Sequence, residues 1–137
     1  MTDYLVDNSV WARLATGDPA VTARLRRIER APADLFVTCP PQVLEFCHSA
    51  RTPEEHARYR EKIGLGFPLE RAPDESLVLD IQSALWGSGL VRSAGAVDIL
   101  IAGYAIVNDA TVLTADHDFD YIARVSDLQY EYVPPSW

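Results

Sequence analysis

The 137-residue sequence lacks the features that mark secreted, membrane-spanning and disulfide-rich proteins. Its two cysteines, Cys39 and Cys47, have no metal-type spacing and no second pair, so we expect reduced core thiols, with a disulfide as the less favoured alternative. The longest apolar run, residues 99–107, is too short to span a bilayer. The N-terminal segment has an acid and no basic region, which predicts a cytoplasmic protein with no signal peptide and no membrane partner.

Signatures of several enzyme classes are also missing. The sequence contains no G-x-S-x-G, P-loop or H-E-x-x-H motif, so nothing supports the hydrolase classes that these motifs mark. Positive charge is scarce, because 12 basic residues stand against 20 acidic ones and the net charge is −8. An acidic chain repels nucleic acid and usually attracts basic partners. The basic cluster at residues 23–30 is most simply a solvated helix face, and a cationic rim is the alternative.

The composition of the sequence is that of a folded domain. Hydrophobic residues make up 48% and charged residues 23% of the chain, which is ordinary for globular proteins. A chain of this length buries a core without disulfides, so we expect one domain over residues 1–137. The apolar stripe Leu77, Ile81 and Leu85 has the spacing of one helix face, and it belongs either to the core or to a dimer face.

Strand and helix signals alternate along the chain. We expect strands over residues 4–7, 35–39, 110–116 and 130–133, with helices between them. We expect Asn8 or Ser9 to cap the first helix. Two of the later helices start with a capping residue followed by a proline, at Asp18–Pro19 and Thr52–Pro53. Because strands joined by helical crossovers pair in parallel, the sequence predicts an α/β fold with a mainly parallel sheet that is covered on both faces.

Two acids come at the ends of predicted strands. Asp7 is expected to be the last residue of the first strand, and Asp116 the last residue of the third. In such sheets the ligand binds at the carboxyl ends of the strands, so both acids belong at the functional edge. Asp3 lies four residues before Asp7 and falls at the opposite end of the strand, which excludes it from that edge.

Other acids have alternative explanations. Glu45 lies among apolar neighbours in a predicted helix, where it is either held inside or solvated. Asp98 opens a very apolar helix, where an acid also complements the helix dipole. Asp118 is either a functional acid or the N-cap of the helix that follows, and Asp120 is expected on the solvent face of that helix.

Carboxylates that gather at one edge of a sheet favour a cation between them. Without it, like charges disfavour ionisation and raise one another's pKa values. Oxygen ligands without supporting Cys or His side chains favour Mg²⁺ or Mn²⁺, ions that also bind phosphate oxygens. A metal-activated water that attacks a phosphodiester needs no protein nucleophile, in keeping with the missing motifs. The acids therefore predict metal-dependent hydrolysis of phosphodiester bonds.

Three blocks of the sequence resemble a known family. "LVDNSVW" (5–11), "VLEFCHSAR" (43–51) and "AVDILIAGYAIVNDATVLTADHDFDYIA" (96–123) are similar, in order and spacing, to blocks of PIN-domain ribonucleases, in particular the VapC toxins of bacterial toxin–antitoxin pairs. The resemblance covers nearly the whole chain. It implies a three-layer α/β/α sandwich with a central parallel sheet, and a Mg²⁺- or Mn²⁺-dependent endoribonuclease. It also implies an RNA substrate, a homodimer and a cognate VapB-type antitoxin.

The resemblance assigns roles to particular residues. The acids that match the family's catalytic metal site are Asp7, Glu45, Asp98 and Asp116. Asp118 matches an auxiliary acid, and Ser9 matches a small hydroxyl residue that can orient the first carboxylate or a bound water. The chain departs from many relatives in the segment "LTA" before Asp116 and in Gly103 of the apolar helix, and neither departure touches an acid.

Two arginines and two rival functions complete the prediction. Arg13 and Arg92 are candidates for phosphate contacts, and ordinary surface salt bridges are the alternative for both. The first rival function is a catalytically silent PIN-type domain that binds RNA or a protein partner, and the intact acid set argues against it. The second is an Asp-nucleophile phosphatase. That chemistry expects an acid two residues after Asp7, where this chain has Ser9.

Overall fold

The computed structural model describes residues 1–136. In chain order, its elements are β1 (Asp3–Val6), α1 (Asn8–Ala15), α2 (Pro19–Arg30), β2 (Leu35–Thr38), α3 (Pro40–His48), α4 (Pro53–Ile63), β3 (Phe67–Pro68), α5 (Glu75–Gly87), α6 (Ala96–Val107), β4 (Thr111–Thr114), α7 (Asp118–Arg124) and β5 (Gln129–Tyr132). Within these residues, none of the helices combines the length and the apolar character needed to cross a membrane.

The strands form one sheet in the order β3-β2-β1-β4-β5, and every neighbouring pair is parallel. At its centre, Leu5 of β1 pairs with Val37 of β2 and with Val112 of β4. This confirms the predicted parallel sheet. The edge strand β3 was not predicted, because two residues that include a proline carry no alternating pattern.

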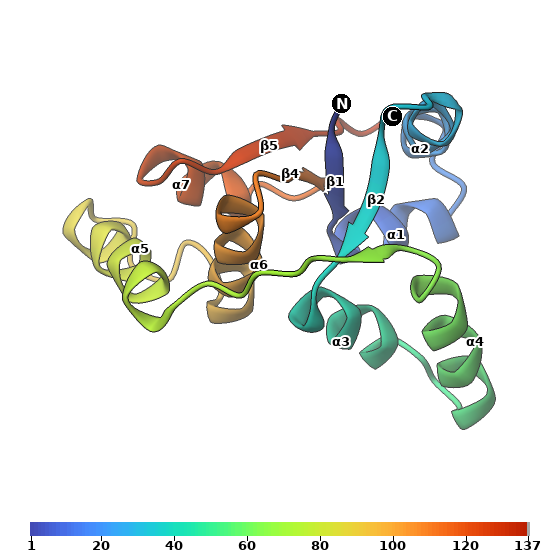
Figure 1. Ribbon diagram of the computed structural model, residues 1–137, viewed down its shortest axis with the longest axis horizontal. Coiled ribbons are helices and arrows are strands. Elements are labelled where there is room, and N and C mark those ends of the chain that lie inside the picture. Colours follow the sequence, from blue (N-terminus) through green and yellow to red (C-terminus); the bar gives the residue numbers. More distant parts are fainter. Residues whose placement is uncertain (137) are drawn as a thin grey trace.

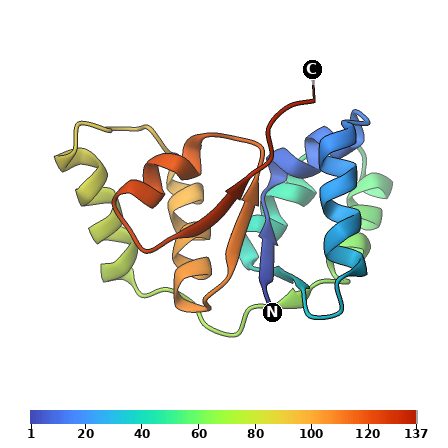
Figure 2. The ribbon, with the colours of Figure 1, turned by 90° about the horizontal axis from the view of Figure 1, so that it is seen from above.

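Helices cover both faces of this sheet (Figures 1 and 2). On one face, Leu5 and Val112 belong to a buried cluster with side chains from α5, α6 and α7. On the other face, Val6 and Leu113 belong to a second cluster with side chains from α1 and α2. Successive strand residues therefore point to opposite faces, as the period of a strand requires. The three-layer α/β/α architecture is confirmed.

Helix starts follow two of the predicted capping signals. The Asp18 side chain accepts a hydrogen bond from the Ala20 N–H at 2.9 Å, and Pro19 is the first residue of α2. The Thr52 hydroxyl accepts a hydrogen bond from the Glu55 N–H at 3.0 Å at the start of α4. Each such cap contributes about 1 kcal/mol to helix stability.

Two strand ends differ from the prediction. β1 ends at Val6 and β4 at Thr114, so Asp7 and Asp116 lie just beyond the strands and are not their last residues. The Asp7 N–H still donates a hydrogen bond to the carbonyl of Leu113 at 2.8 Å, which extends the pairing of β1 with β4 by one bond. The backbone of Asp7 therefore follows the strand while the chain is already turning into α1.

The first residues of two helices also differ from the prediction. Asn8 or Ser9 was the expected cap of α1, but the Asp7 side chain caps it by accepting a hydrogen bond from the Ser9 N–H. Asp118 is not the N-cap of α7, because His117 holds that position and Asp118 is the first helical residue. Asp7 therefore caps α1 from one residue earlier than expected. Asp118 lies one residue further into α7 than an N-cap.

The apolar stripe on α5 faces the core. Ile81 and Leu85 are buried in the cluster that covers one face of the sheet, and Leu77 packs against it. Of the two alternatives that the sequence left open, core or dimer face, the stripe therefore belongs to the core. Cys39 and Cys47 are buried and unpaired, as expected for core thiols.

Candidate metal centre

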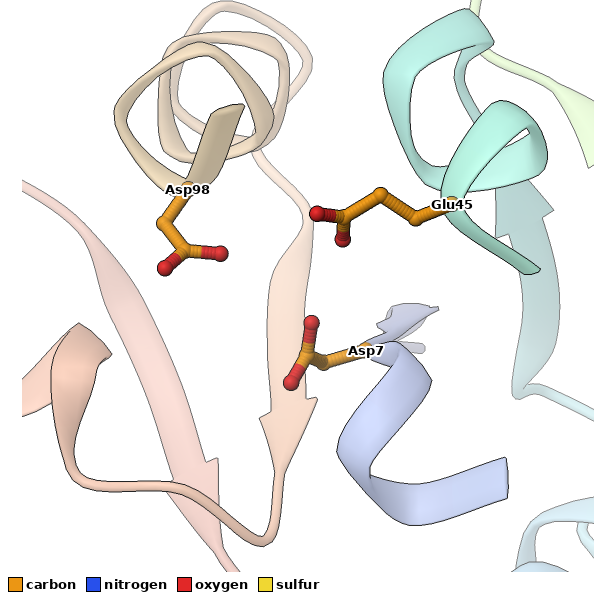
Figure 3. Close-up of side chains that lie close together, drawn as sticks. All are labelled: Asp7, Glu45 and Asp98. Atoms are coloured by element: carbon orange, nitrogen blue, oxygen red, sulfur yellow. The ribbon is translucent and has the colours of Figure 1, made fainter. Parts of the chain in front are cut away.

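Three carboxylates from separate elements converge beyond the carboxyl end of β1 (Figure 3). Asp7 caps α1, Glu45 lies on α3, and Asp98 lies in the first turn of α6. Each offers a carboxylate oxygen, and these oxygens all lie within 4.8 Å of one another. The structure thus brings together three of the four acids that the sequence assigned to a metal site. We call them the acid trio.

Asp7 is the buried member of the acid trio. Its Oδ2 accepts hydrogen bonds from Ser9 Oγ at 2.6 Å and from Thr114 Oγ1 at 3.3 Å. Burial raises the pKa of Asp7, and the hydrogen bonds from Ser9 oppose part of that rise. Ser9 also accepts a hydrogen bond from the Ala115 N–H at 2.9 Å, so its hydroxyl is itself held in place.

Glu45 reaches the site because α3 is anchored at the end of β1. The buried Gln42 side chain donates a hydrogen bond to the carbonyl of Val6 at 2.7 Å and accepts one from the Cys39 N–H at 3.3 Å. Glu45 comes three residues after Gln42, which places it on the same side of the helix. Burial raises the pKa of Glu45, and the nearby charge of Asp7 raises it further. The side chain is therefore held at the site and is not simply solvated.

Asp98 has the largest shift of the acid trio. Burial raises its pKa to about 7, and the charges of Asp7, Asp118 and Glu45 contribute in that order. The helix dipole at the first turn of α6 favours the ionised form, so it acts in the opposite direction. Complementing the dipole is therefore not the dominant effect on this carboxylate.

Asp116 and Asp118 form a second group after β4, which we call the loop pair. Asp116 is exposed, and its Oδ1 accepts a hydrogen bond from the Asp118 N–H at 2.8 Å. The Asp116 N–H donates to Thr114 Oγ1 at 3.1 Å. Burial, followed by the charge of Asp116, raises the pKa of Asp118, and the Asp98 carboxyl donates a hydrogen bond to Asp118. The loop pair thus borders the acid trio, and its role as metal ligand stays a prediction.

The two arginines lie in different settings. The Arg13 guanidinium donates to the carbonyl oxygens of Ala115 at 3.0 Å and of Val133 at 3.2 Å. These contacts tie α1 to the segments that follow β4 and β5, which favours a bracing role. Arg92 is exposed in the loop before α6 and has a left-handed backbone with φ of 59°. Phosphate contacts of either arginine stay predictions.

The position of Asp120 was predicted wrongly. Its side chain is not on the solvent face of α7, because only a quarter of it is exposed and it forms a hydrogen bond with His117 Nδ1 at 2.9 Å. His117 in turn stacks on Tyr132 at a centroid distance of 4.4 Å. These contacts join the start of α7 to β5, so the Asp120 side chain helps to hold these two elements together.

Sequence reasoning missed two residues that support the site. Thr114 is buried at the end of β4 and links Asp7 with the backbone of Asp116. Gln42 is a buried residue of α3, and its hydrogen bond to the carbonyl of Val6 positions the helix that carries Glu45. A signal existed for Thr114, because a hydroxyl at the carboxyl end of a central strand lies beside any ligand bound there. Gln42 follows two prolines in a helix start, which by itself indicates only an N-terminal turn.

The donor set fits a hard divalent cation. The three converging groups offer only carboxylate oxygens, with neither Cys nor His among them. Oxygen-only sites favour Mg²⁺ or Mn²⁺ over softer metals. A cation at this place would favour the ionised carboxylates and so reverse the upward pKa shifts that burial and repulsion cause.

Comparison with known proteins identifies the family. The model of the PIN domain family matches residues 4–125. Over 135 residues, the chain is 33% identical to Ribonuclease VapC21 of Mycobacterium tuberculosis, and the match covers 96% of this chain and 94% of that protein. This chain belongs to the VapC family of PIN-domain proteins. The resemblance expected from the three sequence blocks is therefore confirmed.

Solved structures of VapC-family complexes share the fold. VapBC-1 from nontypeable Haemophilus influenzae matches with a TM-score of 0.70 at 22% identity, over 96% of this chain and 98% of that chain. VapBC-5 from Mycobacterium tuberculosis, a member of the VapBC family of toxin-antitoxin systems, matches with a TM-score of 0.65 at 17% identity, over 97% and 100% of the two chains. Both support the α/β architecture of this VapC-family chain.

Proposed function

We propose that this VapC-family chain is a Mg²⁺- or Mn²⁺-dependent endoribonuclease and acts as the toxin of a toxin–antitoxin pair. The observation that carries the proposal is the convergence of Asp7, Glu45 and Asp98 within 4.8 Å, with a raised pKa at each carboxyl. Gathering like charges costs stability unless a cation takes up the charge. The relative named Ribonuclease VapC21 supports RNA as the substrate class.

Each residue has a role in this proposal. The residues that would hold the cation are Asp7, Glu45, Asp98 and Asp116, with Asp118 in support. When bound, the cation supplies an activated water and neutralises charge that develops on the phosphate. Ser9 holds Oδ2 of Asp7 in one orientation through the 2.6 Å hydrogen bond, which leaves the other carboxylate oxygen for the cation. Hydrolysis joins the water oxygen to phosphorus and breaks the bond to one ribose oxygen, which takes up a proton.

The proposal includes an antitoxin and a homodimer. The titles of the matching structures name VapBC complexes, which supports a VapB-type antitoxin as partner of this chain. Several large apolar side chains are exposed on α3, α5, α6 and the loop before α6, namely Leu44, Leu79, Trp86, Val91, Val97 and Leu100. Apolar side chains exposed in such number are typical of protein interfaces. Light scattering of the purified chain would show one dimer mass if a second copy covers part of this surface.

The test of the proposed activity is cleavage of total cellular RNA by the purified, antitoxin-free chain. Reactions with Mg²⁺, with Mn²⁺ and with EDTA are compared with the same reactions of Asp7→Asn. We expect discrete fragments with either metal, and none with EDTA or with the variant. Fragments that persist in EDTA would contradict the metal-dependent mechanism.

The alternative is a catalytically silent PIN-type domain that binds RNA or a protein. The acid trio argues against it, because a binding domain has no need for three carboxylates with raised pKa values at one point. A folded, antitoxin-free chain that cuts no RNA with any divalent metal would support this alternative.

A further inference from the structure

A hollow of about 650 Å³ opens beside the acid trio, between α1, α3 and α4. The residues that line it include aromatic, cationic and small polar side chains, among them Asn8, Trp11, Ser49, Arg51, Tyr59 and Lys62. We call it the α1–α4 groove. The groove contains two cations, Arg51 and Lys62, and one acid, Glu55, in a chain with a net charge of −8.

The α1–α4 groove is continuous with the proposed metal site. Asn8 directly follows Asp7 in the chain, and it lines both this groove and a smaller hollow that contains Glu45. Ser49, one turn after Glu45, also lines both hollows. A strand of substrate that places one phosphate at the acid trio can therefore continue into the groove.

The chemistry of the α1–α4 groove matches a nucleotide. Trp11 and Tyr59 are partly exposed aromatic rings, and rings of this kind stack with bases of any sequence. Lys62 Nζ lies 5.7 Å from the centroid of the Trp11 ring, so a cation and a stacking surface occur together. Arg51 is exposed beside them and supplies a second phosphate donor. Glu55 is engaged within the protein, where it accepts a hydrogen bond from the Arg51 N–H at 3.2 Å.

The indole N–H of Trp11 is an unsatisfied hydrogen-bond donor. Its indole Nε1 is buried and has no hydrogen-bond partner among the described residues. A buried donor without an acceptor costs about 1–3 kcal/mol, so its presence at the wall of a groove calls for an explanation. Because this nitrogen is itself buried, a base in the groove would contact the ring of Trp11 and not its N–H.

A second hollow shares Trp11 and Lys62 with the α1–α4 groove but has a more apolar wall. It encloses about 420 Å³ between α2, α4 and the sheet, and Leu14, Leu25, Phe36 and Leu65 contribute to a mainly apolar wall. Apolar walls suit a protein segment and offer little to a polyanion. The second hollow also contains two cations, Arg26 and Lys62, and one acid, Glu29, so charge does not separate the two. The more polar wall of the α1–α4 groove and the ring of Tyr59 favour it for nucleic acid.

We propose that the α1–α4 groove is a subsite for the RNA strand next to the scissile bond, with one phosphate at Arg51, a second at Lys62 and a base on Trp11. This inference rests on the proposed ribonuclease function and adds the residues that bind substrate outside the metal site. It also explains how an acidic chain holds a polyanion, since the cations sit beside the carboxylates and not among them.

The test compares two double variants that remove the same charge. Arg51→Gln with Lys62→Gln removes both cations of the groove, and Arg27→Gln with Arg30→Gln removes two exposed cations of α2 that line neither hollow. Binding of a fluorescein-labelled, single-stranded RNA of mixed sequence is measured by anisotropy in the Asp7→Asn background, so that the RNA stays intact. Cleavage of total RNA is measured with the natural Asp7.

We expect the groove variant to bind the labelled RNA at least tenfold more weakly, and the α2 variant to stay within twofold of the parent. The slope of log affinity against log salt should fall by roughly 1.4 in the groove variant, since each lost phosphate contact on single-stranded nucleic acid removes about 0.7. The cleavage rate at saturating RNA should change by less than threefold. Trp11→Phe, which keeps a ring but offers a smaller stacking surface, should weaken binding about three- to tenfold.

Other results would overturn the inference in distinguishable ways. Equal affinities and salt slopes in the two double variants, with RNA cleavage by the parent, would remove the subsite and leave the proposed function. Normal RNA binding combined with lost inhibition by the antitoxin would assign the groove to the protein partner. A parent chain that neither binds nor cuts RNA would remove the proposed function, and the subsite with it.

Discussion

The acid trio and the loop pair lie side by side but are built differently. The trio draws Asp7, Glu45 and Asp98 from three elements and buries them at least in part, whereas the loop pair comes from one turn of chain after β4. Asp116 is held by local hydrogen bonds to Thr114 and Asp118, which a short loop can form by itself. The trio exists only when the whole sheet is assembled. Long-range structure therefore forces the trio together, and local structure arranges the pair.

This difference decides where the repulsion is largest. Burial raises the pKa of Asp98 to about 7, and repulsion from carboxylates of both groups adds to the rise. Asp116 is exposed, where water screens charge. A cation bound among the trio would relieve more unfavourable energy than one bound at the loop pair alone.

The largest expected effect is that of Asp7→Asn. The substitution keeps the shape of the side chain and its contact with Ser9, but it removes the charge that would hold the cation. We expect RNA cleavage to fall about 10³-fold or more, equivalent to about 4 kcal/mol. Circular dichroism and the thermal midpoint should show a folded protein. A rate within tenfold of the parent would exclude Asp7 as a ligand.

Asp116→Asn should cost less than Asp98→Asn. Because Asp116 lies in the exposed loop pair, we expect a loss of about 10- to 100-fold in cleavage, against about 10³-fold for Asp98→Asn. Titration of activity with Mn²⁺ should show recovery of Asp116→Asn at high metal concentration. Equal losses in the two variants would show that the loop pair and the trio act as one ligand set.

Ser9→Ala tests the group that orients Asp7. Loss of the 2.6 Å hydrogen bond frees the carboxylate, and we expect cleavage or metal affinity to fall about tenfold. Ser9→Thr keeps the hydroxyl and is the matched control, with an expected change of less than threefold. If Ser9→Ala cleaves like the parent, the hydrogen bond serves the fold alone.

The smallest effect concerns the stability of the metal-free chain. Asp98 keeps its proton up to about pH 7 in the folded state but releases it near 3.8 when unfolded. Its contribution to stability is therefore complete below 3.8 and is lost as the pH rises through 7. Allowing for solvent screening, we expect Asp98→Asn to raise the free energy of unfolding at pH 8 by about 1 kcal/mol.

Urea unfolding with EDTA at pH 5 and pH 8 measures this effect. The parent should lose stability between the two values, Asp98→Asn should lose less, and Mg²⁺ should stabilise the parent more at pH 8 than at pH 5. A parent whose stability in EDTA rises from pH 5 to pH 8 would contradict the assigned pKa.

The sheet was open to prediction from patterns in the sequence, whereas the trio was open to it only in part. Short runs of strand-forming residues marked β1, β2 and β4, and the rule for parallel sheets then put Asp7 at the ligand edge. Glu45 and Asp98 needed the resemblance to VapC toxins, since each had an ordinary explanation as a helix residue. Their convergence could not be predicted from spacing, because it depends on how α3 and α6 pack at the end of the sheet.

The failures also have physical causes. Asp7 and Asp116 were placed inside strands because residue type does not show where backbone pairing stops. Asp120 was placed on the solvent face from its charge, although its hydrogen bond with His117 depends on the stacking of that ring on Tyr132. Contacts between distant segments decide such positions, and a single sequence does not contain them in readable form.

The all-parallel sheet has a consequence for synthesis of the chain. β1 lies between β2 and β4 in the sheet. Leu5 can pair with Val112 only after most of the polypeptide has been synthesised. The carboxylates of Asp7 and Asp98 cannot meet on a ribosome-bound fragment that ends before α6. For a protein proposed to cut RNA, the proposed site is therefore complete only after most of its own message has been translated.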